Sequence, residues 1–257
     1  MASLRGKTAL VTGASRGIGR ATALRLGAGG ALVAVHYGQD EAAAKDVVAD
    51  IEAAGGQAFA VGARLGAIAD VDALVAAFDA AVSAYTDDPG IDILVNNAGI
   101  LRLGALDALT EADLDAMLAI NVKAPLFLIQ RLLPRMRDGG RIINLSSVLT
   151  QLAAPHAVGY AMSKGAVEAL TKALAKGLAG RRITVNAVAP GVTDTDMNAR
   201  LRTDPQARAK AAARSPFGRV GDVDEVADVV AFVASDASRW ITGATFDASG
   251  GSLLGAA

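Results

Sequence analysis

Short apolar runs alternate along the chain with longer, alanine-rich stretches of helical character. The apolar runs predict seven strands, at KTALVTG, ALVAVHY, QAFAVGA, IDILVNN, RIINLSS, ITVNAVAP and GATFDASG. The stretches between them predict helices at about 18–28, 41–54, 70–85, 111–136, 159–179 and 222–234. Because the strands are apolar almost throughout and are separated by helices, they predict a parallel sheet covered on both faces.

This order of elements is typical of an α/β fold, namely a doubly wound, Rossmann-type sheet of seven parallel strands with helices on both faces. No linker, repeat or low-complexity tract marks a boundary, so residues 1–257 are expected to form one domain. Thr110 begins the sequence TEAD, which resembles the capping box that starts many helices. Residues 191–217 are polar, charged and too long for an ordinary connection. We expect this stretch to be a substrate lid.

Composition narrows the possible classes of function. A hydrophobic content of 52% and a net charge of −1 fit a globular protein with a sizeable core and give no reason to expect a nucleic-acid or membrane partner. The chain has no cysteine and only two histidines, His36 and His156, so we expect no disulfide, no thiolate chemistry and no metal site. The sequence shows no apolar signal-peptide core and no membrane-spanning run, which predicts a cytoplasmic protein.

A glycine-rich turn follows the first predicted strand, in TGASRGIG at residues 12–19. Gly13, Gly17 and Gly19 precede a helix, and this arrangement lets the backbone approach a pyrophosphate at the helix N-terminus. Such a turn alone is weak evidence. Its place between the first strand and the first helix of an alternating chain favours nucleotide binding.

A second candidate site lies in SSVLTQLAAPHAVGYAMSK, residues 146–164. Tyr160 and Lys164 are four residues apart and therefore share one face of a helix. They could be an ordinary surface pair or, with a preceding serine, a proton-transfer site. Ser146 and Ser147 are both available, and either hydroxyl could instead satisfy the local backbone.

Together these motifs resemble the classical short-chain dehydrogenase/reductase (SDR) family and are similar to those of 3-oxoacyl-carrier-protein reductase-like ketoreductases. The resemblance extends from about Lys7 to Gly251. It rests on TGASRGIG, NNAG at 96–99, Asn121 in INVKA, Ser147, YAMSK at 160–164 and PG at 190–191, which occur in the family's order. Of the two serines, only Ser147 has the family spacing to Tyr160.

The resemblance implies a catalytic set of Asn121, Ser147, Tyr160 and Lys164. In the family the serine polarises the substrate carbonyl, and the tyrosine exchanges a proton with its oxygen. The lysine lowers the pKa of the tyrosine and binds the nicotinamide ribose, while the asparagine holds a relay water at a helix kink. A phenol with a pKa of about 10 is a poor base at neutral pH, so a nearby ammonium group makes chemical sense.

The same resemblance implies a nicotinamide cofactor. The implied contacts are Gly13, Ser15, Arg16, Gly17, Ile18, Gly19, Tyr37, Gly38, Arg64, Leu65, Asn97, Ala98, Gly99, Tyr160, Lys164, Pro190, Gly191, Val192, Thr193 and Thr195. Tyr37 stands where NAD-preferring members carry an acid, and Arg16 is placed to meet a 2′-phosphate. NADP(H) is therefore expected to be preferred over NAD(H). Arg64 replaces an Asp that binds adenine, and since arginine cannot accept that bond it either stacks on the base or points outward.

We therefore expect an NADPH-dependent ketoreductase that transfers a hydride between nicotinamide and a small-molecule carbonyl or secondary alcohol, with 3-oxoacyl substrates among the candidates. The alternative is a cofactor-sensing regulator of SDR fold without turnover, which would not need the complete catalytic set. A homotetramer is expected, in which helices 111–136 and 159–179 meet their symmetry mates through apolar positions such as Leu114, Met117, Leu118 and Leu126. Val148, Leu149, Leu152, Ala153 and Ala154 predict an apolar substrate wall. Surface arginines 135, 137, 181 and 182 could meet an acidic carrier protein or be solvated.

Overall fold

The sheet of the protein has seven parallel strands in the order β3-β2-β1-β4-β5-β6-β7. This computed structural model describes residues 3–254. The strands are β1 (Thr8–Val11), β2 (Leu32–Tyr37), β3 (Gln57–Gly62), β4 (Ile91–Asn96), β5 (Met136–Leu145), β6 (Thr184–Pro190) and β7 (Thr245–Ala248). The seven-stranded Rossmann-type fold expected from the alternating pattern is confirmed.

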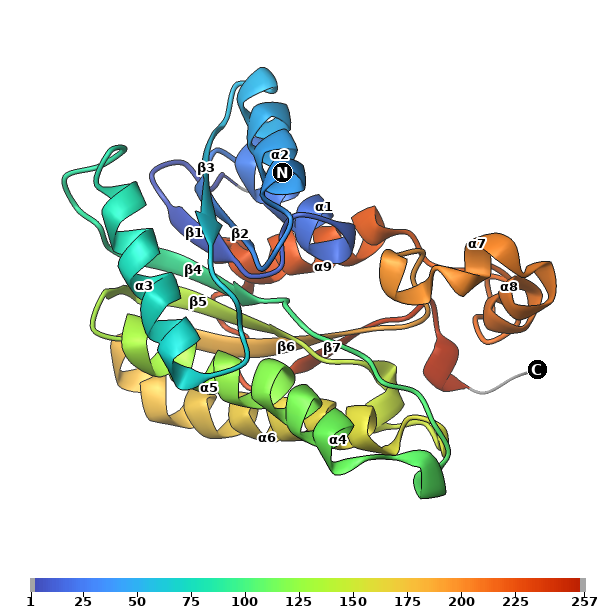
Figure 1. Ribbon diagram of the computed structural model, residues 1–257. Coiled ribbons are helices and arrows are strands. Elements are labelled where there is room, and N and C mark those ends of the chain that lie inside the picture. Colours follow the sequence, from blue (N-terminus) through green and yellow to red (C-terminus); the bar gives the residue numbers. More distant parts are fainter. Residues whose placement is uncertain (1–2, 255–257) are drawn as a thin grey trace.

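Helices cover both faces of this sheet (Figure 1). The α-helices of the described residues are α1 (Gly17–Ala28), α2 (Glu41–Ala53), α3 (Ile68–Val82), α4 (Glu111–Leu118), α5 (Ala124–Leu132), α6 (Val158–Leu178), α7 (Arg200–Thr203), α8 (Pro205–Ala212) and α9 (Val223–Ala234). Of these, α7 and α8 lie apart from the two layers that cover the sheet. The capping box predicted at Thr110 is partly present, because Thr110 Oγ1 accepts a hydrogen bond from the backbone N–H of Asp113 at 3.1 Å.

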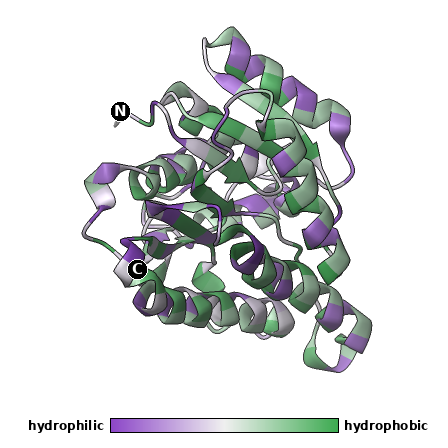
Figure 2. Ribbon diagram, turned by 90° about the vertical axis from the view of Figure 1, so that its left-hand side faces the viewer, coloured by the Kyte–Doolittle hydropathy of each residue, from purple (hydrophilic) through white to green (hydrophobic). Residues whose placement is uncertain are grey.

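Two apolar cores lie on opposite sides of the sheet. Residues of α1, α2 and α9 form the first, and residues of α3, α5 and α6 form the second. Neighbouring strand positions divide between them, since Ala9 and Val11 belong to one core and Leu10 to the other. The strands therefore need apolar residues at nearly every position, and Figure 2 shows them coloured largely as hydrophobic. Each fully buried large aliphatic side chain contributes about 1.5–3 kcal/mol to folding.

The helix predicted at 111–136 is interrupted and ends earlier than expected. A π-helical turn at Ala119–Lys123 separates α4 from α5, and the chain enters β5 at Met136. The cause lies in Pro125, which has no N–H to donate to the carbonyl of Asn121 four residues earlier. The N–H of Ala124 instead reaches back five residues to the carbonyl of Ala119. This turn carries Asn121 in the protein interior.

Residues 191–217 fold back on themselves beside the sheet and include α7 and α8 (Figure 1). At their base, Thr193 pairs with Gly221 as an isolated parallel bridge. Asp194 accepts from Arg202 at 3.0 Å and from Arg208 at 2.9 Å, which fastens the helices to the base of the segment. The charges that mark this stretch in the sequence thus largely serve to fold it.

The order of the strands reverses between β1 and β4, because the chain continues outward from β1 in both directions. Ligands of doubly wound sheets bind at such a point, beyond the carboxyl ends of the strands. None of the helices within residues 3–254 combines the length and apolar content needed to cross a bilayer. Across the same residues there is no group of three or more His, Cys, Asp or Glu side chains arranged to hold a metal ion.

Candidate active site

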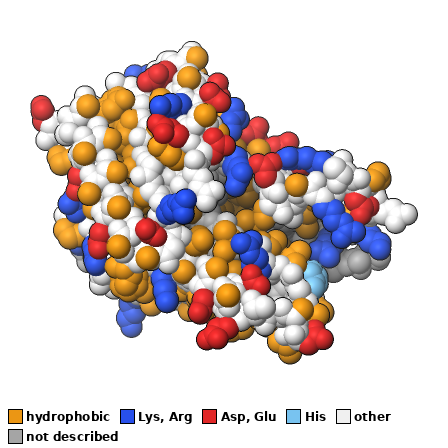
Figure 3. Space-filling model, in the orientation of Figure 1, with side chains coloured by type: hydrophobic (Ala, Val, Ile, Leu, Met, Phe, Trp, Pro, Cys, Tyr) orange, Lys and Arg blue, Asp and Glu red, His pale blue; other side chains and the backbone are white. Residues whose placement is uncertain are grey.

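A cleft of about 1270 Å³ opens at the carboxyl ends of the strands. Figure 3 shows the molecular surface hollowed between the body of the protein and the segment with α7 and α8. The cleft is lined by the glycine turn, by loops that follow five successive strands and by residues of 191–217. It brings together all the residues predicted as site residues except Asn121 and Tyr37.

The glycine turn forms one end of the cleft. Gly13 has a φ of +62° and Gly17 a φ of +57°, in the left-handed region that favours glycine. A Cβ at Gly19 would overlap the carbonyl oxygen of Gly13, and one at Gly13 would lie 3.0 Å from the Cα of Ala98. Only a chain without side chains at these positions can make this turn, whose exposed backbone fits a pyrophosphate at the start of α1.

His36 holds the glycine turn in place. Its Nδ1 accepts the N–H of Gly13 at 3.0 Å, and its Nε2 donates to the carbonyl of Ala63 at 2.9 Å. This pairing requires the neutral ring, because a protonated imidazole has no acceptor. Burial lowers the pKa of His36 to about 4, and the bond to Ala63 opposes this shift. His36 is thus a buried residue at the strand end that also organises the predicted nucleotide-binding turn.

Thr12 and Asn97 join the ends of β1 and β4. Thr12 Oγ1 accepts the backbone N–H groups of Asn97 and Ala98, both at 3.0 Å. Asn97 Nδ2 in turn donates to the carbonyls of Thr12 and Gly13, at 2.8 and 3.0 Å. The NNAG motif therefore braces the glycine turn from the neighbouring strand and fixes the cradle before any ligand arrives.

Tyr160 and Lys164 lie one turn apart on α6 and both line the cleft. Lys164 is buried, and its Nζ donates to the carbonyl of Leu145 at 2.6 Å and lies 5.7 Å from the centre of the Tyr160 ring. Burial lowers the pKa of Lys164 to about 8. Burial raises the pKa of Tyr160 to about 12, and a hydrogen bond with Ser147 acts in the opposite direction. At neutral pH the tyrosine therefore carries its proton and the lysine is charged.

The two serines of the SS pair have different partners. Ser147 ends the loop after β5, and its Oγ accepts the N–H of Leu149 at 3.2 Å while interacting with Tyr160. Ser146 directs its hydroxyl to Glu168 at 2.6 Å. The hydroxyl of Ser146 is thus engaged by Glu168, whereas that of Ser147 is the one that interacts with Tyr160, in agreement with the family spacing.

Asn121 lies beneath the cleft. Its Nδ2 donates to the carbonyl of Ile100 at 2.9 Å and to Ser163 Oγ at 3.0 Å, and its Oδ1 accepts the N–H of Ile100 at 2.9 Å. A Cβ built on Gly99 would lie 3.2 Å from Asn121 Oδ1 and 3.5 Å from Lys164 Nζ. The side chains of Asn121 and Lys164 therefore both lie next to Gly99, in the NNAG turn.

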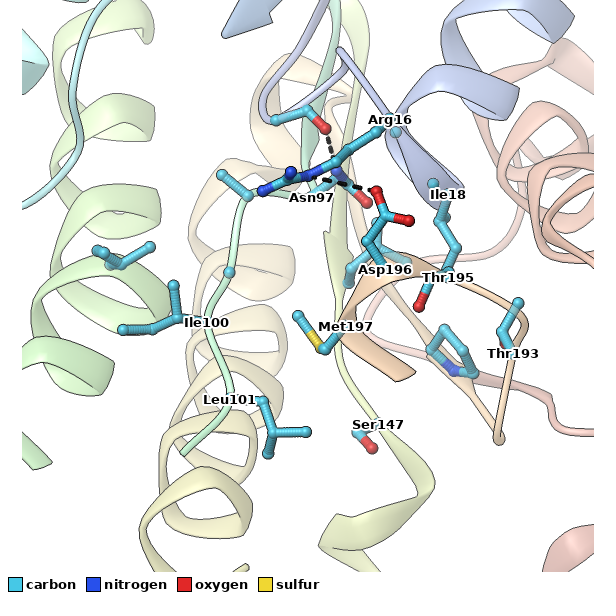
Figure 4. Close-up of a pocket in the computed structure, with 18 of the residues that line it drawn as sticks. Arg16, Ile18, Asn97, Ile100, Leu101, Ser147, Thr193, Thr195, Asp196 and Met197 are labelled. Atoms are coloured by element: carbon cyan, nitrogen blue, oxygen red, sulfur yellow. Dashed lines mark hydrogen bonds and ion pairs between the residues drawn. The ribbon is translucent and has the colours of Figure 1, made fainter. Parts of the chain in front are cut away.

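Cations line the cleft at the glycine turn and after β3. Arg16 and Arg64 are exposed and line it, and Arg16 Nε lies 3.9 Å from Asp196 Oδ2 (Figure 4). Tyr37 does not line the cleft, because its ring lies over Gly62 on the neighbouring strand. Gly38, the next residue, does line it. The sequence placed both residues at the cofactor, whereas the structure brings only the glycine to the cleft.

The remaining predicted contacts lie where β6 ends. Pro190, Gly191, Val192, Thr193 and Thr195 all line the cleft. Gly191 packs closely on Ser249, since a Cβ there would lie 2.9 Å from the Cα of that residue. Thr193 is buried and bonds the carbonyl of Gly191 at 3.2 Å, whereas Thr195 is only partly buried.

Apolar residues surround the cleft on the side of Ser147. Of the predicted wall, Val148, Leu149 and Leu152 line the cleft, while Ala153 and Ala154 do not. Further apolar lining residues come from elements that the sequence did not single out by residue: Ile100, Leu101, Leu103 and Met197. Figure 4 shows Leu101 and Met197 on the side of Ser147.

Comparison with known proteins identifies the family. The model of a family described as enoyl-(acyl carrier protein) reductase matches residues 13–252. The 3-oxoacyl-[acyl-carrier-protein] reductase FabG of Staphylococcus aureus is 41% identical over 250 residues, which cover 96% of this chain and 98% of that protein.

Solved structures extend the likeness. The promiscuous reductase LugOII, described as catalysing keto-reduction at C1 during lugdunomycin biosynthesis, is 52% identical with a TM-score of 0.95, over 98% of this chain and 99% of that one. The angucycline C-6 ketoreductase LanV with bound NADP is also 52% identical, with a TM-score of 0.96, over 99% and 98% of the chains. On the family match and these identities over nearly the whole chain, the chain belongs to the classical short-chain dehydrogenase/reductase family and is an NAD(P)-dependent oxidoreductase of the ketoreductase kind.

Proposed function

We propose that the protein uses NADPH to reduce a ketone carbonyl on a polycyclic, largely apolar substrate. The observation that carries the proposal is one cleft with a glycine cradle at one end and Ser147, Tyr160 and Lys164 within an apolar compartment at the other. The glycine end fits the pyrophosphate of a nicotinamide dinucleotide, because the glycines leave the backbone N–H groups open to phosphates. The other end fits a substrate carbonyl, because the hydroxyl groups of Ser147 and Tyr160 can donate hydrogen bonds to its oxygen.

The chemistry divides between cofactor and chain. When bound, NADPH would supply the hydride that the carbonyl carbon receives. Ser147 and Tyr160 donate hydrogen bonds to the carbonyl oxygen, and Tyr160 then transfers its proton to it. Because burial keeps the pKa of Tyr160 at about 12, the phenol holds the proton that reduction consumes. The charge of Lys164 stabilises the tyrosinate that remains. Asn121 lies near Lys164 beside Gly99, where it would hold the relay water that the family resemblance implies.

Relatives support the substrate class. The LanV structure with bound NADP and rabelomycin is 51% identical to this chain with a TM-score of 0.92. The lining of Leu101, Leu103, Leu149, Leu152 and Met197 offers a flat ring system an apolar surface on several sides. We propose that residues 191–217 close over this substrate as a lid, with the Arg16–Asp196 contact joining the lid to the glycine turn.

A carrier-protein-bound substrate is less well supported. Three of the four arginines considered for docking are paired with carboxylates of the chain itself: Arg135 with Asp79, Arg137 with Asp88 and Asp92, and Arg181 with Asp138. In these pairs the nitrogen and oxygen atoms lie 2.5–3.1 Å apart, so an acidic partner would have to displace a carboxylate of the chain. A free small molecule is therefore the favoured substrate.

The proposal includes a preference for NADP(H), a cytoplasmic location and a homotetramer. Arg16 and Arg64 supply the positive charge that a 2′-phosphate requires, and two LanV structures contain NADP. Exposed apolar side chains occur on the helices expected to pair, including Leu126 on α5 and Met162 on α6. Met117, one of the positions expected at the interface, is buried within the chain and cannot contribute. Light scattering at micromolar concentration measures the assembly, and a monomer contradicts it.

The test of function is NADPH oxidation with a panel of ketones. We expect turnover with bicyclic and polycyclic ketones, slower turnover with acyl thioesters, and loss of turnover in Tyr160→Phe with NADPH binding retained. The alternative, a cofactor-sensing regulator, predicts NADPH binding without turnover of any ketone. It is the outcome that would refute this proposal.

A further inference from the structure

Glu168 extends the catalytic face of α6 by one more turn. Tyr160, Lys164 and Glu168 follow each other at intervals of four residues, so their side chains lie along one side of the helix. The mechanism above uses the first two and leaves the third unexplained. Glu168 is half-buried, and its carboxylate faces the chain segment that carries Ser147.

One carboxylate oxygen of Glu168 bonds residues on both sides of the catalytic serine. Ser146 Oγ donates to Glu168 Oε1 at 2.6 Å, and Thr150 Oγ1 lies 3.0 Å from the same oxygen. Thr150 Oγ1 also lies 2.9 Å from the carbonyl of Ser147, so its hydrogen is shared between the carboxylate and the backbone of the serine. Ser147 therefore lies between two residues that Glu168 holds.

The other bonds of this loop come mainly from the backbone: the N–H of Ser146 donates to the carbonyl of Val188 on β6 at 2.7 Å, and the N–H of Thr150 donates to the carbonyl of Ser147 at 3.2 Å. The Ser147 hydroxyl accepts the N–H of Leu149 at 3.2 Å, a contact within the same short loop. The firm links from this loop to α6 come from Lys164, which bonds the carbonyl of Leu145 at 2.6 Å, and from Glu168. Helix α6, which carries Tyr160, thus also bonds the segment that carries Ser147: Lys164 bonds it at Leu145, and Glu168 bonds it on both sides of Ser147.

We propose that Glu168 is a positioning residue, which sets the distance and direction of the Ser147 hydroxyl relative to that of Tyr160. The inference rests on the proposed function, since the relative placement of these two hydroxyls matters only if both meet one carbonyl oxygen. An ionised acceptor makes shorter and stronger hydrogen bonds than a neutral one, which suits a role in holding a loop. A catalytic group displaced by about 1 Å costs on the order of a hundredfold in rate.

The first experiment compares substitutions at Glu168 with a matched surface control. Glu168→Leu removes the acceptor and should lower kcat by about ten- to a hundredfold with little change in the dissociation constant of NADPH. Glu168→Gln keeps an acceptor oxygen and should recover most of this loss. Glu52→Leu replaces an exposed carboxylate on α2 and should leave kcat unchanged. Thermal unfolding and light scattering of each variant show whether the fold and the assembly are intact.

A double-mutant cycle separates positioning from general destabilisation. If Glu168 acts through the serine, Glu168→Leu should have no further effect on the residual rate of Ser147→Ala, whereas a structural role would lower both rates by the same factor. Should Glu168→Leu fail to fold, Ser146→Ala combined with Thr150→Val removes the same two bonds from the other side and enters the same cycle.

Three results would overturn the inference: a kcat for Glu168→Leu within twofold of the wild type, no recovery in Glu168→Gln, or equal factors in the presence and absence of the Ser147 hydroxyl. A wild-type protein without ketone turnover refutes the proposed function itself. An active wild type with an equally active Glu168→Leu variant refutes the positioning role alone.

Discussion

Protonation of His36 in the unfolded chain should lower the free energy of unfolding between neutral and mildly acidic pH. Its neutral ring links the glycine turn to the end of β3, and burial lowers its pKa from 6.5 to about 4. In the unfolded chain the imidazole binds a proton as the pH falls through 6.5, whereas in the folded chain it stays neutral until about pH 4. A lowered folded-state pKa therefore gives stability that is complete above pH 6.5 and is lost as the pH falls toward 4.

The magnitude follows from the size of the shift. Each pKa unit corresponds to about 1.4 kcal/mol, so the change from 6.5 to about 4 corresponds to about 3 kcal/mol of unfolding free energy. This is a large fraction of the roughly 5–15 kcal/mol that stabilises a typical domain. Because folded His36 keeps its neutral ring until about pH 4, its bond to Gly13 should stay intact over this range.

The assay is urea unfolding without nucleotide, from neutral pH down to about pH 4, on the wild type and on His36→Asn. The variant should be less stable at neutral pH, since it loses the bond to Ala63, but its stability should fall less on acidification, by up to about 3 kcal/mol. His156→Asn, at the exposed second histidine, is the matched control. Parallel curves for the wild type and His36→Asn would show that the imidazole titrates alike in both states and would refute the reasoning.

Three further predictions concern catalysis and cofactor choice. Tyr160→Phe should lose about 10²–10⁴-fold in turnover and keep NADPH affinity, and near-normal activity in stopped-flow or steady-state assays would contradict its role as acid. The rate of ketone reduction should be constant near neutral pH and should decline as the pH rises past about 8, where Lys164 loses its charge. The rate of alcohol oxidation should increase as the pH rises toward about 12, because Tyr160 ionises. The pH dependence of the rate in both directions checks these signs. Arg16→Ala should weaken NADPH binding by about tenfold, which is the lower end for a charge-assisted hydrogen bond because the side chain is exposed. Gly38→Asp should shift the preference toward NADH. Fluorescence titration of both cofactors measures these affinities, and equal affinities of the wild type for NADPH and NADH would contradict the prediction.

Much of the site could be predicted from local spacing alone. The interval of four residues between Tyr160 and Lys164 places both on one helical face wherever that helix lies. A glycine-rich turn after a buried strand lies at the carboxyl edge of any parallel sheet, and so does NNAG after the fourth strand. These features depend on short-range geometry, which the sequence shows directly.

The predictions that needed revision depend on contacts between distant segments. Tyr37 follows His36, and in a strand successive side chains point to opposite faces, so one meets the glycine turn while the other lies over β3. No local pattern tells which of the two faces the cleft. The helix break near Asn121 had a local signal in Pro125, and the resemblance to the family pointed to a kink there as well.

The sequence by itself determined the alternation of strands and helices, the glycine turn and the helical pairing of tyrosine with lysine, because each needs only neighbours within a turn or a strand. Tertiary structure decided which partner the Ser146 hydroxyl takes, which histidine nitrogen accepts the N–H of Gly13, and that Glu168 bonds the loop of the catalytic serine. These contacts join side chains from different elements, and their distances depend on the order of the strands and on how α6 packs beside β5 and β6. A shift of one residue in the register of a strand would turn the side chains that now face the cleft to the other face of the sheet. The packing of the elements, and not the spacing along the sequence, therefore determines these contacts.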